Sequence, residues 1–290
     1  MRIIHLLNFF AGSPENDRVQ QRTLESLQLA HGFAGAVGVD VTYLFLGNQK
    51  DITYLRSLLS ESGFKGRHQL VLANTDPGRY PFLHGRSNPS LTDTFFGAEV
   101  RAQLTELCGG MPAQDCLIVI SNTDICLRPH AYLGVSLIHR RERRVSFVIN
   151  RETLADALLD QPIQKSFAAV GQKHPGHDFF CLTPNCYFAM DLDEGSHLVG
   201  FGFVMRPVLA NMIFAADAFA EIGASRLTFH YGDDMPWKDA KWNEALAFNR
   251  RGMVSVYWRL HRARYSQLSP QRRALLSKFF PVSLVGSGHD

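Results

Sequence analysis

The 290-residue sequence lacks the motifs of several common enzyme classes. It contains no GxGxxG and no GxxxxGK[ST] segment, which argues against a dinucleotide-binding fold and against a P-loop kinase. It also contains no GxSxG segment, the strand-to-helix turn that presents the nucleophile of α/β-hydrolases. Nucleophilic catalysis therefore finds little support in the sequence.

Cysteine is scarce, and its five positions include no CxxC pair. Most of the cysteines lie in apolar runs, at Cys108, Cys116, Cys126, Cys181 and Cys186. An odd number without CxxC spacing argues against a disulfide framework and against a structural zinc site. We therefore expect a protein of the reducing cytoplasm.

Long apolar runs and strong net charge are absent as well. No run of about 18 apolar residues occurs, so we expect no membrane-spanning helix. The apolar start MRIIHLLNFFAG is interrupted by Asn8 and followed by a polar segment, which favours a first strand at 3–7 over a signal peptide. The formal net charge of +3 is too small to suggest nucleic acid as a partner.

Strand and helix patterns alternate over the first 150 residues. Strands are predicted at 3–7, 39–46, 69–73, 116–120 and 145–149. Helices are predicted to begin at Pro14, with Ser13 as N-cap, at Asp51 as a cap, at Thr92 and at Pro129. This alternation is typical of a largely parallel sheet with helices on both faces.

The rest of the sequence is less regular. Residues 74–88 are rich in glycine and proline and predict a loop. Later strands are predicted at 179–182, 187–190 and 227–230, and later helices at 207–221 and 238–251. We predict one domain over 1–290, with a nucleotide-binding half at 1–150, an acceptor-facing half at 151–240 and a basic helical extension at 241–290.

The polar segment SNTD at 121–124 interrupts an apolar run. Residues 116–120 are all apolar, as in a strand that is buried on both faces. Asn122 and Asp124 follow at the carboxyl end of that strand, which is where open α/β sheets bind their ligands. A polar turn, in which these side chains bond their own backbone, explains the same residues, and spacing alone does not choose between the two.

A second polar segment, LTFHYGDDMPW at 227–237, also follows an apolar strand. A divalent cation bound to a diphosphate needs one or two carboxylates and often an imidazole. Asp124 with His230 meets that minimum, and we expect Asp233, Asp234 and Trp237 to contact substrate. A histidine bonded within a turn, followed by an ordinary helix cap, is the alternative interpretation.

The third segment is HPGHDFF at 174–180. Pro175 and Gly176 predict an irregular backbone just before His177 and Asp178 enter a buried strand. A carboxylate held there can act as a general base on a sugar hydroxyl, so we assign Asp178 a catalytic role and His177 a substrate contact. The alternative is a Pro-Gly turn whose aspartate caps a neighbouring element.

Three further features are candidates for binding. Arg151 ends the strand FVINRET and either contacts phosphate or pairs with a nearby acid. Asn8, after the first strand, is a candidate for contacting a base or ribose. Residues 250–278 contain eight Lys and Arg and no Asp or Glu, which indicates either a surface for anionic lipid or glycan, or a solvated helix face.

Taken in order, these segments resemble a family of glycosyltransferases with the GT-A fold. The residues that carry the resemblance are LLNFF at 6–10, Gln20, Gln21 and Thr23, SNTDICLRP at 121–129, FVINRE at 147–152, HPGHDFF and LTFHYGDDMPW. The resemblance spans about 3–237 and implies a GT-A-like α/β fold: a mostly parallel sheet flanked by helices, with an irregular acceptor-facing second half.

The same resemblance implies roles for individual residues. Asp124 stands at the metal and diphosphate position of the DxD motif, and His230 is similar to the C-terminal histidine that completes metal binding. Asp178 falls near the acid/base carboxylate of inverting members. One position departs from the pattern, because Asn122 replaces the first acidic residue of the motif and an amide binds a hard cation less strongly than a carboxylate.

The sequence therefore predicts a glycosyltransferase that moves a sugar from a nucleotide-sugar donor to a hydroxyl acceptor, with Mn²⁺ or Mg²⁺ as cofactor. A bacterial surface polysaccharide is the hypothesis for the acceptor, and the basic stretch at 250–278 predicts peripheral membrane contact. Two alternatives stay open. One is a catalytically weak module that binds a nucleotide-sugar or a glycan, and the other is a metal-dependent phosphoesterase built on HPGHD and HYGDD.

Overall fold

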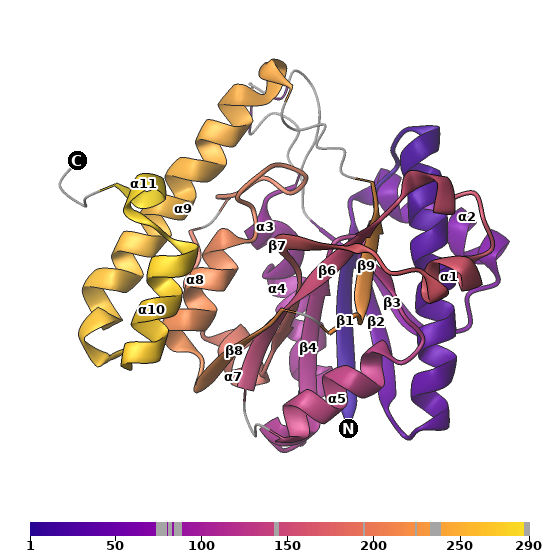
Figure 1. The fold of residues 1–290 in the computed structure, drawn as a ribbon, viewed down its shortest axis with the longest axis horizontal. Helices are drawn as coiled ribbons and strands as arrows, with labels where there is room; N and C mark the ends of the chain where they lie inside the picture. Colours follow the sequence, from indigo (N-terminus) through magenta and orange to yellow (C-terminus); the bar gives the residue numbers. More distant parts are fainter. Residues whose placement is uncertain are drawn as a thin grey trace.

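One twisted sheet runs through the molecule (Figure 1). The computed structural model describes residues 1–73, 80, 83, 89–141, 145–193, 195–223, 225–232 and 239–286. Within these ranges the sheet consists of β1 (Arg2–Asn8), β2 (Asp40–Gly47), β3 (Arg67–Leu72), β4 (Cys116–Ser121), β5 (Cys126–Leu127), β6 (Val145–Leu154), β7 (Gln172–Leu182), β8 (Ala218–Ile222) and β9 (Thr228–Tyr231). The strand order is β3-β2-β1-β4-β7-β6-β9-β5, and β8 pairs with β6.

The sheet is parallel in its first half and mixed in its second. Strands β3, β2, β1 and β4 all run in the same direction. Strand β7 is antiparallel to both of its neighbours, β4 and β6, whereas β8 and β9 are parallel to β6. The predicted fold class is therefore confirmed, and β7 joins the two halves of the chain by pairing with β4 on one side and β6 on the other.

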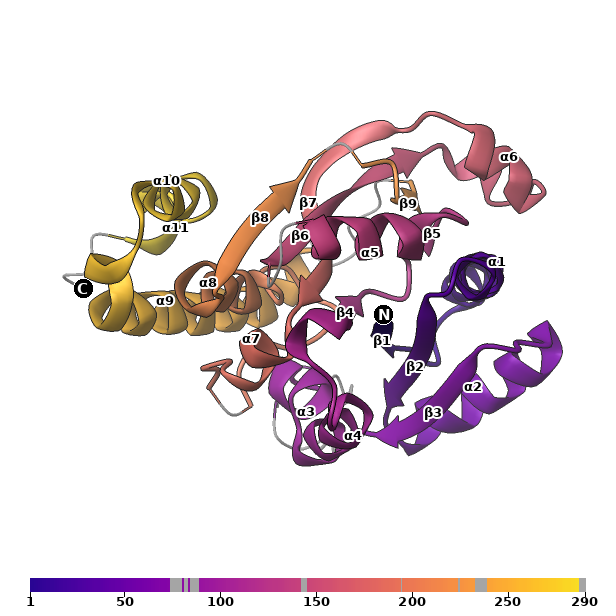
Figure 2. The same ribbon diagram turned by 90° about the horizontal axis from the view of Figure 1, so that it is seen from below.

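Helices cover both faces of the sheet. They are α1 (Pro14–Ala36), α2 (Gln49–Ser62), α3 (Leu91–Phe95), α4 (Ala98–Cys108), α5 (Ala131–Arg141), α6 (Ile163–Ala168), α7 (Pro184–Phe188), α8 (Arg206–Ala215), α9 (Asn243–Arg264), α10 (Pro270–Phe279) and α11 (Val282–Val285). Helices α1, α2 and α5 pack on one face, and α3, α4 and α7–α10 pack on the other, as Figure 2 shows from below. In β1, Ile3 and Leu7 face the first group and Ile4 and Leu6 the second, which explains the unbroken apolar run.

The predicted helices differ from the observed ones in detail: α5 begins at Ala131, not at Pro129, and α9 begins at Asn243, not at 238. The expected helix from Thr92 to Cys108 is divided into α3 and α4 at Gly97, where an added Cβ would lie 2.8 Å from the carbonyl oxygen of Asp93. Helix α2 is capped by Asn48, not Asp51. Asp51 is its third residue and completes a capping box with Asn48.

The second half of the sequence was harder to predict. Residues predicted as a strand at 187–190 belong partly to α7, which begins with Thr183 as N-cap and Pro184 as first residue. The helix predicted at 207–221 ends at Ala215, and β8 follows it. Helix α9 extends to Arg264, well beyond the predicted end at Arg251.

No helix in the described ranges combines the length and the apolar character that a membrane crossing requires.

Candidate functional site

The strand order creates a natural binding edge beside β1. Strand β1 lies between β2 on one side and β4 on the other, so the order of the strands reverses at β1. Ligands of open α/β sheets bind at such a switch point, outside the carboxyl ends of the strands. Asn8 ends β1, and Asn122 and Asp124 follow β4, so three of the predicted residues lie at this edge.

Strand pairing brings Asp124 to His230. The short strand β5 pairs antiparallel with β9, with Cys126 opposite Phe229, so the residues before β5 lie beside those that follow Phe229. Asp124 Oδ2 lies 3.2 Å from His230 Nε2. The other ring nitrogen, Nδ1, lies 2.9 Å from the carbonyl oxygen of Gly232, and since a carbonyl only accepts, Nδ1 donates this hydrogen bond.

The pair shifts the pKa values of both partners. Burial alone would raise the pKa of the Asp124 carboxyl, but the hydrogen bond and charge of His230, aided by Arg151, bring it below its usual value. Burial alone would lower the pKa of the His230 imidazole, but Asp124 brings it above its usual value. The pair is therefore an ion pair over the pH range between the two values.

Asp178 belongs to a second group of polar side chains. Arg151 Nη1 donates a hydrogen bond to Asp178 Oδ2 as part of an ion pair. Asn122 Nδ2 lies 3.4 Å from Asp178 Oδ1, so both carboxylate oxygens face a donor. The sequence left open whether Arg151 contacts phosphate or a nearby acid; in this structure its acidic partner is Asp178.

A bulge between β6 and β7 places these residues. Strand β6 pairs Asn150 with His177 and Glu152 with Lys173. Only Arg151 lies between the two paired residues of β6, whereas residues 174–176 lie between those of β7, and the extra residues form the bulge. Bulges of this kind redirect side chains, and they are common beside active sites. The irregular backbone that Gly176 predicted is therefore present, although it lies within a long strand.

His174 also lies in this group, although no role was predicted for it. The Gly176 backbone N–H donates to His174 Nδ1 at 2.9 Å. His174 Nε2 lies 3.4 Å from Arg151 Nη2. A Cβ on Gly176 would lie 2.7 Å from His174 Cε1, so a side chain at this position would have to displace the ring.

Arg151 connects the two groups into one site. It bonds to Asp178, and its positive charge lowers the pKa values of both Asp124 and His230. The structure thus brings together five of the predicted residues, contributed by the segment after β4 and by β6, β7 and β9: Asn122, Asp124, Arg151, Asp178 and His230.

Two predicted binding residues have other partners. His177 Nε2 lies 3.1 Å from Glu221 Oε1, and its ring packs edge-on against Phe279 at 4.9 Å. Burial lowers the pKa of His177, although Glu221 acts in the opposite direction. Asn8 is buried, and its side-chain amide donates to the Leu46 carbonyl at 2.9 Å. Their predicted substrate contacts stay predictions.

Asp233, Asp234 and Trp237 lie outside the described residues. Their predicted substrate contacts likewise stay predictions.

The loop after β1 is held by two side chains, of Gln20 and Asp51, for which no such contact was predicted. Gln20 Oε1 accepts from the Phe10 N–H at 3.1 Å, and Gln20 Nε2 donates to the Phe10 carbonyl at 2.9 Å. Asp51 accepts from the Ala11 N–H at 3.0 Å, and burial raises the pKa of its carboxyl. These bonds fix the loop beside the switch point. They could not be predicted from local sequence patterns, because the bonded residues are 10 and 40 positions apart.

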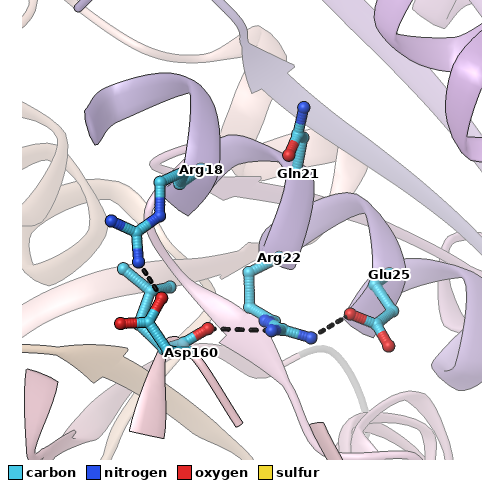
Figure 3. Close-up of a pocket in the computed structure, with 6 residues that line it drawn as sticks. Arg18, Gln21, Arg22, Glu25 and Asp160 are labelled. Carbon is cyan, nitrogen blue, oxygen red and sulfur yellow. Dashed lines mark hydrogen bonds and ion pairs between the residues drawn. The ribbon is translucent and has the colours of Figure 1, made fainter. Parts of the chain in front are cut away.

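A hollow of about 310 Å³ lies elsewhere, between α1 and the segment that follows β6 (Figure 3). Its lining consists of Arg18, Gln21, Arg22, Glu25, Leu159 and Asp160. Arg18 pairs with Asp160, and Arg22 pairs with Glu25, so the main charges of the hollow are neutralised within it. None of the residues at the carboxyl ends of β1 and β4 lines it, and we assign it no role.

Part of the basic C-terminal stretch fastens the last helices to the body of the protein. Arg259 forms ion pairs with Asp191 at 3.0 Å and Asp193 at 2.5 Å. Lys278 pairs with Glu221 on β8. Other arginines of the stretch are exposed, among them Arg251 and Arg262. Intramolecular pairing thus accounts for part of this charge, and membrane contact stays a prediction.

The donor atoms of Asp124 and His230 fit a divalent cation. Asp124 Oδ1 is buried and has no hydrogen-bond partner within the described part of the chain. Because His230 Nδ1 donates to a carbonyl, its Nε2 is the atom available as a ligand, which is the usual arrangement for metal-binding histidines. No cluster of three or more His, Cys, Asp or Glu side chains suited to a metal occurs among the described residues. Within the described residues, Asp124 and His230 would therefore supply two ligands to such a cation.

Comparison with known proteins identifies the fold. No family model matches the chain, and no curated protein matches it by sequence. The chain is similar to the solved structure of TarS residues 1–349 from S. aureus in complex with UDP-GlcNAc, with a TM-score of 0.51, 7% identity, and coverage of 98% of this chain and 82% of that one. At this identity the likeness shows the fold alone, which is GT-A-like, as the sequence predicts.

Two weaker similarities involve other transferases. GalNAc-T7, solved with UDP, GalNAc and Mn²⁺, gives a TM-score of 0.47 at 9% identity, covering 90% of this chain and 47% of that one. The inositol-1-phosphate CTP transferase from T. maritima gives 0.43 at 11% identity, covering 87% of this chain and 97% of that one.

Proposed function

We propose that this protein is a glycosyltransferase that moves a sugar from a nucleotide-sugar donor to a hydroxyl group of a glycan or another acceptor. The observation that carries the proposal is the convergence of Asn122, Asp124, Arg151, Asp178 and His230 at one edge of a GT-A-like sheet. A structure similar in fold, that of TarS, was solved with UDP-GlcNAc, which supports a nucleotide-sugar as the donor class.

Asp124 and His230 are the residues that would hold Mn²⁺ or Mg²⁺ in this proposal. A bound cation would neutralise the negative charge that develops on the departing diphosphate. The hydrogen bond from His230 Nδ1 to the Gly232 carbonyl orients the His230 ring so that Nε2 faces Asp124. Binding of a cation there would require loss of the proton that the ion pair shares, so affinity should rise with pH.

Asp178 is the proposed general base. The acceptor hydroxyl oxygen forms a bond to the anomeric carbon while the bond from that carbon to the diphosphate oxygen breaks. Asp178 takes the hydroxyl proton, and the diphosphate leaves with the bonding electrons. Asn122 and Arg151 hold both carboxylate oxygens of Asp178 in place before the acceptor arrives.

Arg151 supplies the fixed positive charge of the site. It bonds to Asp178, and its charge also acts on the Asp124–His230 pair. A guanidinium group binds phosphate oxygens in the same manner as carboxylate oxygens. Arg151 can therefore exchange part of its contact with Asp178 for a phosphate oxygen, which would leave Asp178 free to accept a proton.

Nucleotide release from a panel of UDP-, GDP- and CMP-sugars, with a mixed glycan acceptor and Mn²⁺, tests the proposal. We expect release with one donor class, and loss of that activity in Asp124→Ala. Asp160→Ala is the matched control, because Asp160 is an exposed carboxylate that pairs with Arg18 away from the site. Full activity in Asp124→Ala would contradict the assignment.

A further inference from the structure

Two cysteines meet at the end of the sheet opposite to the site. Cys108 is the last residue of α4, and Cys116 is the first residue of β4, whose other end leads to Asn122 and Asp124. Their sulfur atoms lie 3.3 Å apart. The connecting segment contains Gly109 and Gly110, and Gly110 has a φ of +73°, a conformation that glycine adopts without strain.

The two thiols differ in their access to solvent. Cys108 is partly exposed, whereas Cys116 is 1% exposed. The remaining cysteines, Cys126, Cys181 and Cys186, are all buried. An exposed thiol beside a buried one is the arrangement of a cysteine that reacts with an oxidant and a second that resolves the product.

The surroundings favour a thiolate at Cys108. Arg2 Nη1 donates to the Leu107 carbonyl at 2.9 Å, which holds the guanidinium at the end of α4. The carboxyl end of a helix is negative and disfavours a thiolate, so this positive charge acts against that effect. The hydrogen bond from Cys116 lowers the pKa of the Cys108 thiol, and the charge of Arg2 lowers it further. The same contact and burial raise the pKa of Cys116.

We propose that Cys108 and Cys116 are a redox-sensitive pair that a hydroperoxide such as hydrogen peroxide converts to a reversible disulfide. The Cys108 thiolate attacks one peroxide oxygen, the O–O bond breaks, and the products are a sulfenic acid at Cys108 and hydroxide, which takes up a proton to form water. The Cys116 thiol then displaces the hydroxyl group of the sulfenic acid. A sulfur–sulfur bond forms, and a second water leaves with the thiol proton.

Closing the bond requires only a small movement. The sulfur atoms must approach from 3.3 Å to about 2.05 Å. Both cysteines lie at the ends of their elements, and Gly109 and Gly110 directly follow Cys108, so the backbone beside Cys108 can adjust without disturbing the middle of β4. In a reducing cytoplasm such a disulfide would be transient and would report oxidative conditions.

Thiol counting on the full-length protein tests this proposal independently of the glycosyltransferase proposal. Treated with hydrogen peroxide, the wild-type protein should fall from five free thiols to three in denaturant, and dithiothreitol should restore five. Peptide mapping should link Cys108 to Cys116. Cys108→Ser should keep its four thiols, whereas the control Cys186→Ser should fall from four to two.

A second variant tests the order of the two steps. In Cys116→Ser the sulfenic acid at Cys108 has no resolving partner, so dimedone should label Cys108 in this variant more strongly than in the wild type. Absence of a Cys108–Cys116 link in the oxidised wild type would overturn the proposal, and so would dimedone labelling of another cysteine in Cys116→Ser.

Discussion

The buried histidine behind the SNTD segment should make the stability of the protein depend on pH. His5 is 0% exposed. Its Nδ1 lies 2.7 Å from the Tyr132 hydroxyl, and its Nε2 lies 2.8 Å from Ser121 Oγ. Burial lowers the pKa of this imidazole to about 3. The folded protein therefore keeps the ring neutral at pH values where the unfolded chain takes up a proton.

The sign and size of the effect follow from this difference. Below an unfolded pKa of about 6.5 the unfolded state binds one more proton than the folded state, so the free energy of unfolding decreases as pH falls. The decrease is about 1.4 kcal/mol per pH unit until the folded pKa is reached, and above about pH 6.5 the contribution of His5 is constant. Between about pH 7 and about pH 5 it amounts to about 2 kcal/mol.

Urea unfolding of the wild type and of His5→Gln at about pH 7 and about pH 5 measures this contribution. The wild type should lose about 2 kcal/mol more stability between the two conditions than the variant, since the other titrating groups are shared. His130→Gln, at an exposed histidine, should behave as the wild type. An equal loss in the wild type and in His5→Gln would refute the reasoning.

Three further substitutions test the site and its supports. Asp178→Asn should lower kcat by about 10²–10⁴-fold in the nucleotide-release assay while donor binding, followed by thermal shift, is retained. Gly232→Ala should lower the free energy of unfolding by about 1–3 kcal/mol in urea, because Gly232 has φ +66° and a methyl group there would collide with the Asp156 carboxylate. In the control, Gly32→Ala should raise the free energy of unfolding by about 1 kcal/mol, because Gly32 lies inside α1 with open space around it. Arg128→Met should destabilise by about 1–3 kcal/mol by the same measurement, because the partly buried carboxylate of Glu152 loses its partner at 2.7 Å and, among the described residues, keeps only Arg226 at 3.3 Å.

The strand ends were predictable because they depend on local signals. An apolar run that stops at Ser121, Asn122 and Asp124 marks a strand and its end whatever the strand packs against. The sequence could not by itself show that Asp124 meets His230, because their contact depends on the pairing of β5 with β9 about a hundred residues later. The resemblance to GT-A glycosyltransferases linked these two residues, and the structure places them together.

The polar partners of Asp178 were less accessible to sequence reasoning. Arg151 reaches it at a bulge between β6 and β7, where His174 lies against Arg151, and bulge positions depend on the register of two strands, not on either strand alone. His177 shows the reverse case. It adjoins Asp178 in the sequence, yet its side chain bonds Glu221, because neighbouring residues of a strand face opposite sides of the sheet.

Secondary structure was predicted least well where an apolar segment is compatible with both a helix and a strand. The segment at 207–222 is apolar throughout most of its length, so periodicity did not show where α8 ends and β8 begins. Helix α7 begins with Thr183 and Pro184, the same combination of N-cap and first residue as Ser13 and Pro14 in α1. This signal indicates a helix at 184–188, which overlaps the strand predicted at 187–190.

Thermal stabilisation by nucleotides tests the central claim most directly, since it needs no knowledge of the acceptor. The wild type and Asp124→Asn would be heated with UDP, GDP, CMP and their sugars, each with and without Mn²⁺. Preferential binding to the folded state stabilises by RT ln(1 + [L]/Kd), so a bound nucleotide raises the melting temperature. We predict a Mn²⁺-dependent rise with one nucleotide class in the wild type and its loss in Asp124→Asn. An unchanged melting temperature with every nucleotide would contradict the proposed donor site.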